Sequence, residues 1–194
     1  MRPIERTEVM PIGEYELIRP HFRARVIEEK KQRRFALGPH MSGVFENRDS
    51  VLLQIQEMLR TERITQDAAI LHEIATYNEL VPGTDEVSMT CFVEISDQAL
   101  REKTLAELAG LERAFAVEIN GERFEAKNTR EEDIVPERTT AVHYLRAKVS
   151  KEAGDAVRDK KAKVAVVVNH PKYEARAELS SAALAALASD FATS

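Results

Sequence analysis

The sequence has few of the features that mark exported, membrane-spanning or metal-cluster proteins. Cys91 is the single cysteine, so the chain has no internal disulfide and no Cys-x-x-Cys pair for zinc or an iron–sulfur cluster. It has no run of about 18 apolar residues, the length that spans a bilayer. Met1 to Met10 mixes charged residues with few apolar ones, unlike a secretory signal. We therefore expect a cytoplasmic protein of a reducing compartment.

Familiar catalytic and phosphate-binding motifs are also missing. The chain contains no Gly-rich phosphate loop, no dinucleotide-binding fingerprint and no Gly-x-Ser-x-Gly elbow of serine hydrolases. The Glu-x-x-His pairs of ferritin-like di-iron bundles and the His-Glu-x-x-His of zinc proteases do not occur either. The sequence therefore identifies no cofactor, and it leaves open whether the protein is an enzyme.

The composition is that of one ordinary globular domain. The chain has 194 residues, of which 43% are hydrophobic and 31% charged, enough to bury a core without disulfides or metal. Its 28 basic and 33 acidic residues give a net charge of -5. No global positive field draws the protein onto nucleic acid or anionic lipid, so any anion site must be local.

Helical periodicity dominates the first part of the chain, about residues 1–82. Between Pro11 and Arg34, apolar residues recur at intervals of three and four, but Pro20 interrupts this pattern. Proline removes a helix hydrogen bond, so we expect a kink or two helices that meet near Arg19. Two further helices are expected, one from the N-cap candidates at residues 47–50 to about residue 63, and one from Thr65 to about Asn78.

The period then changes from 3.6 to 2 in the second part, about residues 83–194, which indicates a sheet. Asn120-Gly121 between two alternating runs predicts a hairpin. A polar stretch around Pro136 predicts a long surface loop over residues 128–140. We expect an α+β fold in one domain, residues 1–194, with a helical N-terminal third packed on a mainly antiparallel or mixed sheet of about four to six strands. The expected strands lie at residues 41–46, 87–95, 115–119, 124–126, 141–149 and 163–168, and further helices at residues 97–108, from 150 and at 180–191.

A local basic patch provides the first candidate site. Seven basic residues lie between Arg19 and Arg34, against two acidic ones. Arginine binds phosphate or carboxylate through two parallel bonds, and a helix N-terminus near Asp49 adds backbone N–H donors. The patch therefore suggests a small anionic ligand, although a salt-bridged pair of solvated helices explains the same charges. The candidate ligand-binding residues are Arg33, Arg34, His40, Glu46, Arg48, Gln56, Glu57 and Arg60.

Two histidines provide the second candidate site. His143 shares the apolar face of its strand, and His170 ends a buried strand. If these strands are neighbours, the histidines approach each other. Glu62, which falls on the apolar stripe of its helix, would supply a third metal ligand. The alternative is a buried, hydrogen-bonded His143 and a His-Pro turn at His170. Cys91, on an apolar strand face, is expected to be a core thiol.

The chain resembles a bacterial family known as domain of unknown function 3501. The resemblance assigns no catalytic or ligand residue. It implies partners only through gene neighbourhood, where genes for rubrerythrin-like proteins and iron–sulfur oxidoreductase subunits occur. The matching segments are residues 30–34 (KKQRR), 37–39 (LGP), 45–49 (FENRD), 54–60 (QIQEMLR), 141–145 (AVHYL) and 170–173 (HPKY).

Three functional hypotheses follow. The first is an accessory protein that binds a small ligand or metal and works with a redox or oxidative-stress system. The second is a structural protein that docks on a redox partner, and the third is a metal-dependent enzyme. The sequence also allows a homo-oligomer.

Overall fold

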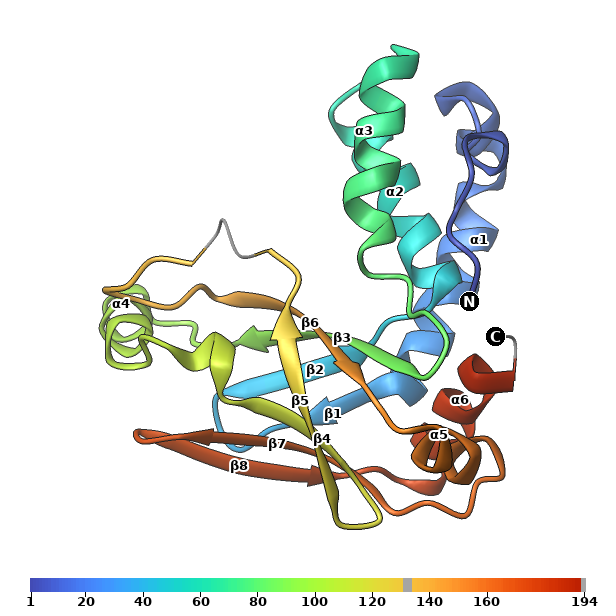
Figure 1. The fold of residues 1–194 in the computed structure, drawn as a ribbon. Helices are drawn as coiled ribbons and strands as arrows, with labels where there is room; N and C mark the ends of the chain where they lie inside the picture. The colour runs from blue at the N-terminus through green and yellow to red at the C-terminus, as the bar shows by residue number, and fades with distance from the viewer. Residues whose placement is uncertain (131–133, 193–194) are drawn as a thin grey trace.

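A computed structural model describes residues 1–130 and 134–192 of the protein (Figure 1). Two 3-10 turns occur at Arg6–Glu8 and Leu111–Arg113. The helices are α1 (Ile12–Arg33), α2 (Arg48–Thr61), α3 (Asp67–Asn78), α4 (Gln98–Glu107), α5 (Lys151–Arg158) and α6 (Ser181–Ala192). The strands are β1 (Arg34–Ala36), β2 (Met41–Phe45), β3 (Glu86–Val93), β4 (Phe115–Ile119), β5 (Glu122–Asn128), β6 (Val142–Lys148), β7 (Val164–His170) and β8 (Tyr173–Glu178).

Helix α1 runs from Ile12 to Arg33 with Pro20 inside it. Of the two predicted alternatives, the one with two helices that meet near Arg19 is therefore wrong, and a kink at this point stays a prediction. Pro20 is exposed, so water can satisfy the carbonyl that loses its partner. Tyr15 and Val26, on either side of the proline, are both buried in a cluster with Leu53 of α2. Packing of both halves against α2 holds the helix in one piece.

The helical region consists of α1, α2, α3 and the segment Met1–Met10, and it projects from the sheet (Figure 1). Asn47 caps α2, because its side chain accepts from the Ser50 N–H at 2.8 Å while the Ser50 hydroxyl accepts from the Asn47 N–H at 3.0 Å. The predicted apolar stripe of α2 supplies Val51, Ile55 and Leu59 to the core of this region.

The segment Met1–Met10 is part of the core of the helical region. Ile4 and Val9 are buried among residues of α2 and α3. Two side-chain amides form hydrogen bonds with its backbone. Asn78 accepts from the Ile4 N–H at 2.8 Å and donates to the Ile4 carbonyl at 2.9 Å. Gln56 accepts from the Met10 N–H at 2.7 Å and donates to the Met10 carbonyl at 3.2 Å. We call these two contacts the amide clamps.

The described strands form one antiparallel sheet of eight strands in the order β1-β2-β3-β6-β5-β4-β7-β8. The α+β class is confirmed, but the prediction of about four to six strands is too low. The two unpredicted strands, β1 and β8, are the two edges of the sheet. β1 is short, and the alternating side chains of β8 are mostly small or charged, so neither gives a strong apolar pattern.

The sheet curves until its two edges approach each other, which gives a barrel-like shape (Figure 1). The hydroxyl of Tyr173, at the start of β8, donates to the Leu37 carbonyl at 2.5 Å and accepts from the His40 N–H at 3.3 Å. It thereby links β8 to the β1–β2 turn. The concave face holds the large apolar core, which includes Phe45, Met89, Phe115, Leu145 and Val166.

Two predicted features of the sheet can be compared with the structure. Asn120 and Gly121 both have positive φ, 51° and 88°, and connect β4 to β5 as the hairpin prediction requires. The predicted surface loop at 128–140 contains residues 131–133, which lie outside the described residues. In its described part, Val135 pairs with Arg138 in an isolated bridge.

The predicted helical part, residues 1–82, also contributes β1 and β2 to the sheet. Met41 and Phe45 from this part belong to the same core as the strands that follow, so the boundary near residue 82 does not separate two cores. No helix in the described part of the chain combines the length and apolarity needed to cross a membrane.

An arginine-lined cleft as the candidate site

A cleft of about 640 Å³ lies where the helical region meets α6. Four parts of the chain form it: the N-terminal residues, the last turn of α1, the first turn of α2, and α6. Figure 1 shows the N-terminus and the end of α6 on this side of the molecule. The lining residues are Met1, Arg2, Glu29, Gln32, Arg33, Asn47, Arg48, Asp49, Ala186, Ser189 and Asp190.

A buried ion pair forms one wall of the cleft. Arg33 donates from Nη1 to Asp190 Oδ2 at 2.6 Å and from Nη2 to Asp190 Oδ1 at 2.8 Å, and Nη2 also donates to the Ala186 carbonyl at 3.1 Å. The two side chains are 6% and 4% exposed. Burial raises the pKa of Asp190, and the bonds from Arg33 oppose that rise. These contacts use three of the five N–H groups of Arg33.

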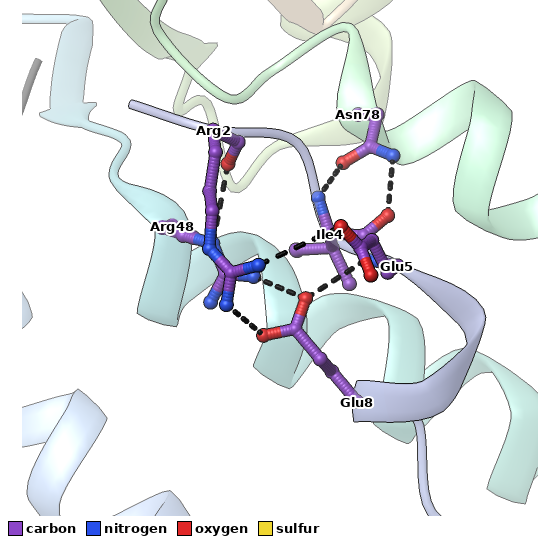
Figure 2. A network of polar contacts seen from close by, with 6 residues as sticks. All are labelled: Arg2, Ile4, Glu5, Glu8, Arg48 and Asn78. Carbon is purple, nitrogen blue, oxygen red and sulfur yellow. Dashed lines mark hydrogen bonds and ion pairs between the residues drawn. The ribbon is translucent and has the colours of Figure 1, made fainter.

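A second arginine enters the cleft from the start of α2. Arg48 donates from Nε to the Arg2 carbonyl at 3.2 Å and from Nη2 to Glu8 (Figure 2). Glu8 also accepts from the Glu5 N–H at 2.9 Å and from Arg2 at 3.1 Å. The bond from the Glu5 N–H and the bond from Arg48 lower the pKa of Glu8. Arg48 thus engages two of its five N–H groups in the described chain.

The first turn of α2 adds backbone donors. The side chain of Asn47 satisfies the Ser50 N–H, and its carbonyl accepts from the Val51 N–H at 3.0 Å. The N–H groups of Arg48 and Asp49 have no acceptor among the described residues, as expected for the first positions of a helix. Both residues line the cleft. The partial positive charge of the helix N-terminus therefore faces this space.

The acidic residues of the cleft already have cationic partners. Nη1 of Arg25 donates to Glu29 at 2.8 Å and to Asp49 at 2.6 Å, and Asp190 is held by Arg33. Arg33 and Asp190 balance each other, whereas the single charge of Arg25 is shared by two carboxylates. Beside these carboxylates, Arg33, Arg48 and the start of α2 contribute N–H donors to the lining. Such a surface matches a ligand that accepts hydrogen bonds.

The structure brings two of the predicted ligand-binding residues, Arg33 and Arg48, into this cleft and places the others elsewhere. Glu46 is 2% exposed. It accepts from the Ser50 hydroxyl at 2.5 Å and from the Thr90 hydroxyl at 2.8 Å, and Lys30 lies 3.5 Å away. Glu46 therefore joins α1, α2 and β3 in the interior.

Glu57 and Arg60 connect α2 to α1. Glu57 accepts from the Tyr15 hydroxyl at 2.6 Å and from Arg19 at 2.7 and 2.9 Å. The bond from Arg19 is the main cause that lowers the pKa of Glu57 to about 2. Arg60 donates to Glu16 at 2.6 Å. These contacts fit the alternative given in the sequence analysis, in which the charges form salt bridges between two helices and bind no ligand.

The other three candidates also lie away from the cleft lining. Gln56 forms one of the amide clamps on Met10. Arg34 begins β1, and its residue is exposed. His40 is exposed in the β1–β2 turn, where its backbone N–H contacts Tyr173. The eight predicted residues thus do not form one site, because they are spread over several parts of the fold.

The two predicted metal-ligating histidines belong to strands that are not neighbours, because β5 and β4 separate β6 from β7. His170 Nδ1 accepts from the Lys172 N–H at 3.2 Å, so Nε2 donates to the Ala109 carbonyl at 3.1 Å. Glu62 is exposed at the C-terminal end of α2, outside the apolar stripe where we predicted it. Within residues 1–130 and 134–192, no group of three or more His, Cys, Asp or Glu side chains is placed to hold a metal.

His143 is buried in the sheet core, with 1% of its surface exposed. Its Nε2 lies 3.3 Å from the Thr139 hydroxyl, its ring lies 5.3 Å from that of Phe115, and its Nδ1 has no partner in the described chain. Burial lowers the pKa of His143 to about 4. The crevice that it lines with Glu112 and Asn128 is too narrow for a water molecule, so it offers no ligand site. Cys91 is a buried free thiol, as predicted.

Sequence reasoning missed Asp190 and the contribution of the N-terminal residues. Asp190 did leave a signal, because it is the single charged residue in the alanine-rich segment 181–192. A lone carboxylate beside Phe191 indicates a buried acid in need of a partner. The sequence contains no comparable signal that Arg2 would lie beside Arg48.

Comparisons with known proteins agree with this fold. A family model described as "Protein of unknown function (DUF3501)" matches residues 3–191. The chain is similar to a crystal structure of a protein of unknown function from Burkholderia pseudomallei K96243, with 28% sequence identity and a TM-score of 0.89. The match covers 97% of this chain and 99% of that one. No curated protein matches the sequence.

Proposed function

This chain belongs to the family described as "Protein of unknown function (DUF3501)", and we propose that it binds a small molecule with a phosphate or carboxylate group. The proposed site is the cleft between Arg33, Arg48 and the start of α2. The observation that carries the proposal is the convergence there of two guanidinium groups, whose contacts within the described chain leave some N–H groups unused, with two backbone N–H groups that have no acceptor in the described chain.

The donor set supports an oxyanion for physical reasons. Guanidinium groups bind carboxylate and phosphate oxygens through paired, charge-assisted bonds. A helix N-terminus stabilises negative charge through its free N–H groups and its dipole. Arg48 combines both features, since its side chain and its backbone N–H belong to the same cleft. Its contacts with Glu8 and the Arg2 carbonyl hold the guanidinium in place before a ligand arrives.

The volume of the cleft limits the kind of ligand. About 640 Å³ lies within the range of roughly 300–1,000 Å³ that is typical of small-molecule pockets. A single phosphate ion would occupy a small part of it. We therefore expect an organic molecule whose anionic group contacts the arginines. Polar side chains such as Gln32 and Ser189 line the same cleft and would contact the remainder of the ligand.

The wider role stays a prediction. The family resemblance suggests a partner in a redox or oxidative-stress system, and the cleft neither requires nor opposes that role. Metal-dependent catalysis and docking on a redox partner are likewise predictions, as is the cytoplasmic location.

The proposal can be tested by thermal unfolding and titration calorimetry with pyrophosphate and citrate as probes. In wild-type protein, a probe at a hundred times its Kd should raise the Tm by roughly 5–10 °C. Arg48→Met should reduce the affinity at least about tenfold, because it removes a charge-assisted contact.

Arg60→Met is the matched control, because Arg60 lies on the same helix and forms an ion pair outside the cleft. It should bind the probes as wild type does. The proposal fails if neither probe binds wild-type protein, or if Arg48→Met and Arg60→Met bind equally well.

A further inference from the structure

Helix α1 carries a second apolar face, which is exposed. Gly13, Leu17, Pro20, Ala24 and Ile27 follow one another at intervals of four, three, four and three residues, and all five are exposed. Leu17 is 80% exposed and Ile27 38%. A side chain added at Gly13 would meet open space. We call this set the α1 seam.

The α1 seam is distinct from the face that attaches α1 to the protein. That face contains Tyr15 and Val26, which are buried against α2, with Phe22 packed beside them. In Figure 1, α1 lies on the outer side of the helical region, beyond α2 and α3. Alternating spacing of three and four is the pattern by which one helix packs along another in a coiled coil. The seam is therefore open to a partner helix.

We propose that the occupant of the α1 seam is the same helix of a second copy of this chain, packed in parallel. In the heptad that the spacing defines, Leu17 and Ala24 occupy a positions, and Gly13, Pro20 and Ile27 occupy d positions. Gly13, Pro20 and Ala24 allow the two backbones to approach closely. Leu17 and Ile27 supply the apolar area that would leave water.

The charges beside the seam select this partner and this direction. Arg23 is a g position and Glu28 the following e position, which face each other across a parallel pair. The twofold axis would form this contact twice. Antiparallel packing would instead place e positions opposite e positions and g positions opposite g positions. Glu14 of one chain would then face Glu28 of the other, and the two copies of Arg23 would face each other, so both contacts would be repulsive.

Both charged residues are available for that contact. Arg23 has no ion-pair partner within the described residues, and its residue is exposed. Glu28 pairs with Lys31 on the same helix at 2.5 Å, with side chains 69% and 64% exposed. Ion pairs so exposed are weak, so Glu28 can exchange this partner at little cost.

Sedimentation velocity over a concentration series tests the proposal with the full chain. Wild-type protein should show a species of twice the 21.9 kDa of one chain. Leu17→Glu should raise the dimer dissociation constant at least about a hundredfold, since it places two carboxylates in the seam. Leu71→Glu, at a 51% exposed leucine of α3, is the matched control and should leave the dimer unchanged.

A charge exchange tests the direction. Arg23→Glu and Glu28→Arg should each weaken the dimer about tenfold, because each puts like charges together, and the double variant should restore it. A protein that is monomeric at all concentrations overturns the proposal. So does a dimer that Leu17→Glu leaves intact, or one that the double variant fails to restore. Circular dichroism on every variant separates loss of association from loss of folding.

Discussion

The helical region and the curved sheet are stabilised by different kinds of contact. The sheet encloses a continuous apolar core with few polar groups, of which His143 is the most deeply buried. The helical region has smaller apolar clusters and relies on directed polar contacts such as the amide clamps and the Glu57 ion pairs. Directed contacts fix side chains in particular orientations, whereas apolar packing tolerates exchange of similar volumes. The candidate cleft borders the helical region, where directed polar contacts hold the side chains in particular orientations.

The strongest test of this comparison removes the ion pair at the junction of the two regions. Arg33→Met removes the guanidinium that donates two bonds to the buried Asp190, and we expect a loss of about 3–5 kcal/mol of unfolding free energy. For a chain of this size the Tm should fall by roughly 10 °C, which differential scanning calorimetry will measure. The double variant Arg33→Met/Asp190→Leu should recover most of the loss. If the double variant is no more stable than the single one, the charge is not the cause.

A second test compares the pH dependence of the sheet core with and without His143. The folded pKa of about 4 lies below the usual 6.5, so the unfolded chain takes up a proton first as the pH falls. Stability is complete above about pH 6.5 and should fall by roughly 3 kcal/mol by pH 4 on account of this residue. His143→Leu should remove that part of the loss in urea unfolding at pH 7 and pH 4.5.

His72→Gln is the control for the pH experiment, because His72 is exposed on α3 and should leave the pH dependence as in wild type. If His143→Leu loses as much unfolding free energy between pH 7 and pH 4.5 as wild type does, burial does not control the protonation of His143.

The smallest expected effect concerns the amide clamps. Asn78→Ala removes both bonds to Ile4 and leaves a buried backbone N–H and carbonyl without partners, so we expect a loss of about 1–3 kcal/mol. Thr76→Ala, on the exposed side of the same helix, should cost less than about 0.5 kcal/mol. Hydrogen exchange should show faster exchange in residues 1–10 for Asn78→Ala alone. Equal stability of the two variants would mean that apolar packing by Ile4 and Val9 holds the segment unaided.

The sequence predicted those parts of the fold whose signals are local. The hairpin at Asn120-Gly121, a helix cap within residues 47–50 and the alternation in β3 and β6 each arise from neighbouring residues, and the structure confirms them. The edge strands were missed because an edge position needs no apolar alternation. Two separate helices around Pro20, one of the two predicted alternatives, do not form, because burial of Tyr15 and Val26 outweighs one lost hydrogen bond.

The candidate site was predictable only in part, for the same reason. Arg33 and Arg48 were chosen for their charge and for the helix start beside them. Asp190, which orients Arg33, is 157 residues away in sequence, and periodicity carries no information about such a pairing. Gln56 and Glu57 were predicted as ligand-binding residues, yet tertiary contacts assign Gln56 to an amide clamp on Met10 and Glu57 to the α1–α2 interface.

The pairing of Arg33 with Asp190 also bears on when the cleft can form during synthesis. The ribosome makes Arg33 157 residues before Asp190, so an emerging chain contains α1 and α2 long before α6 exists. Until then the guanidinium of Arg33 has no buried carboxylate to orient it, and one wall of the cleft is missing. The proposed ligand binding therefore requires α6, and a fragment that ends before α6 should lack the site.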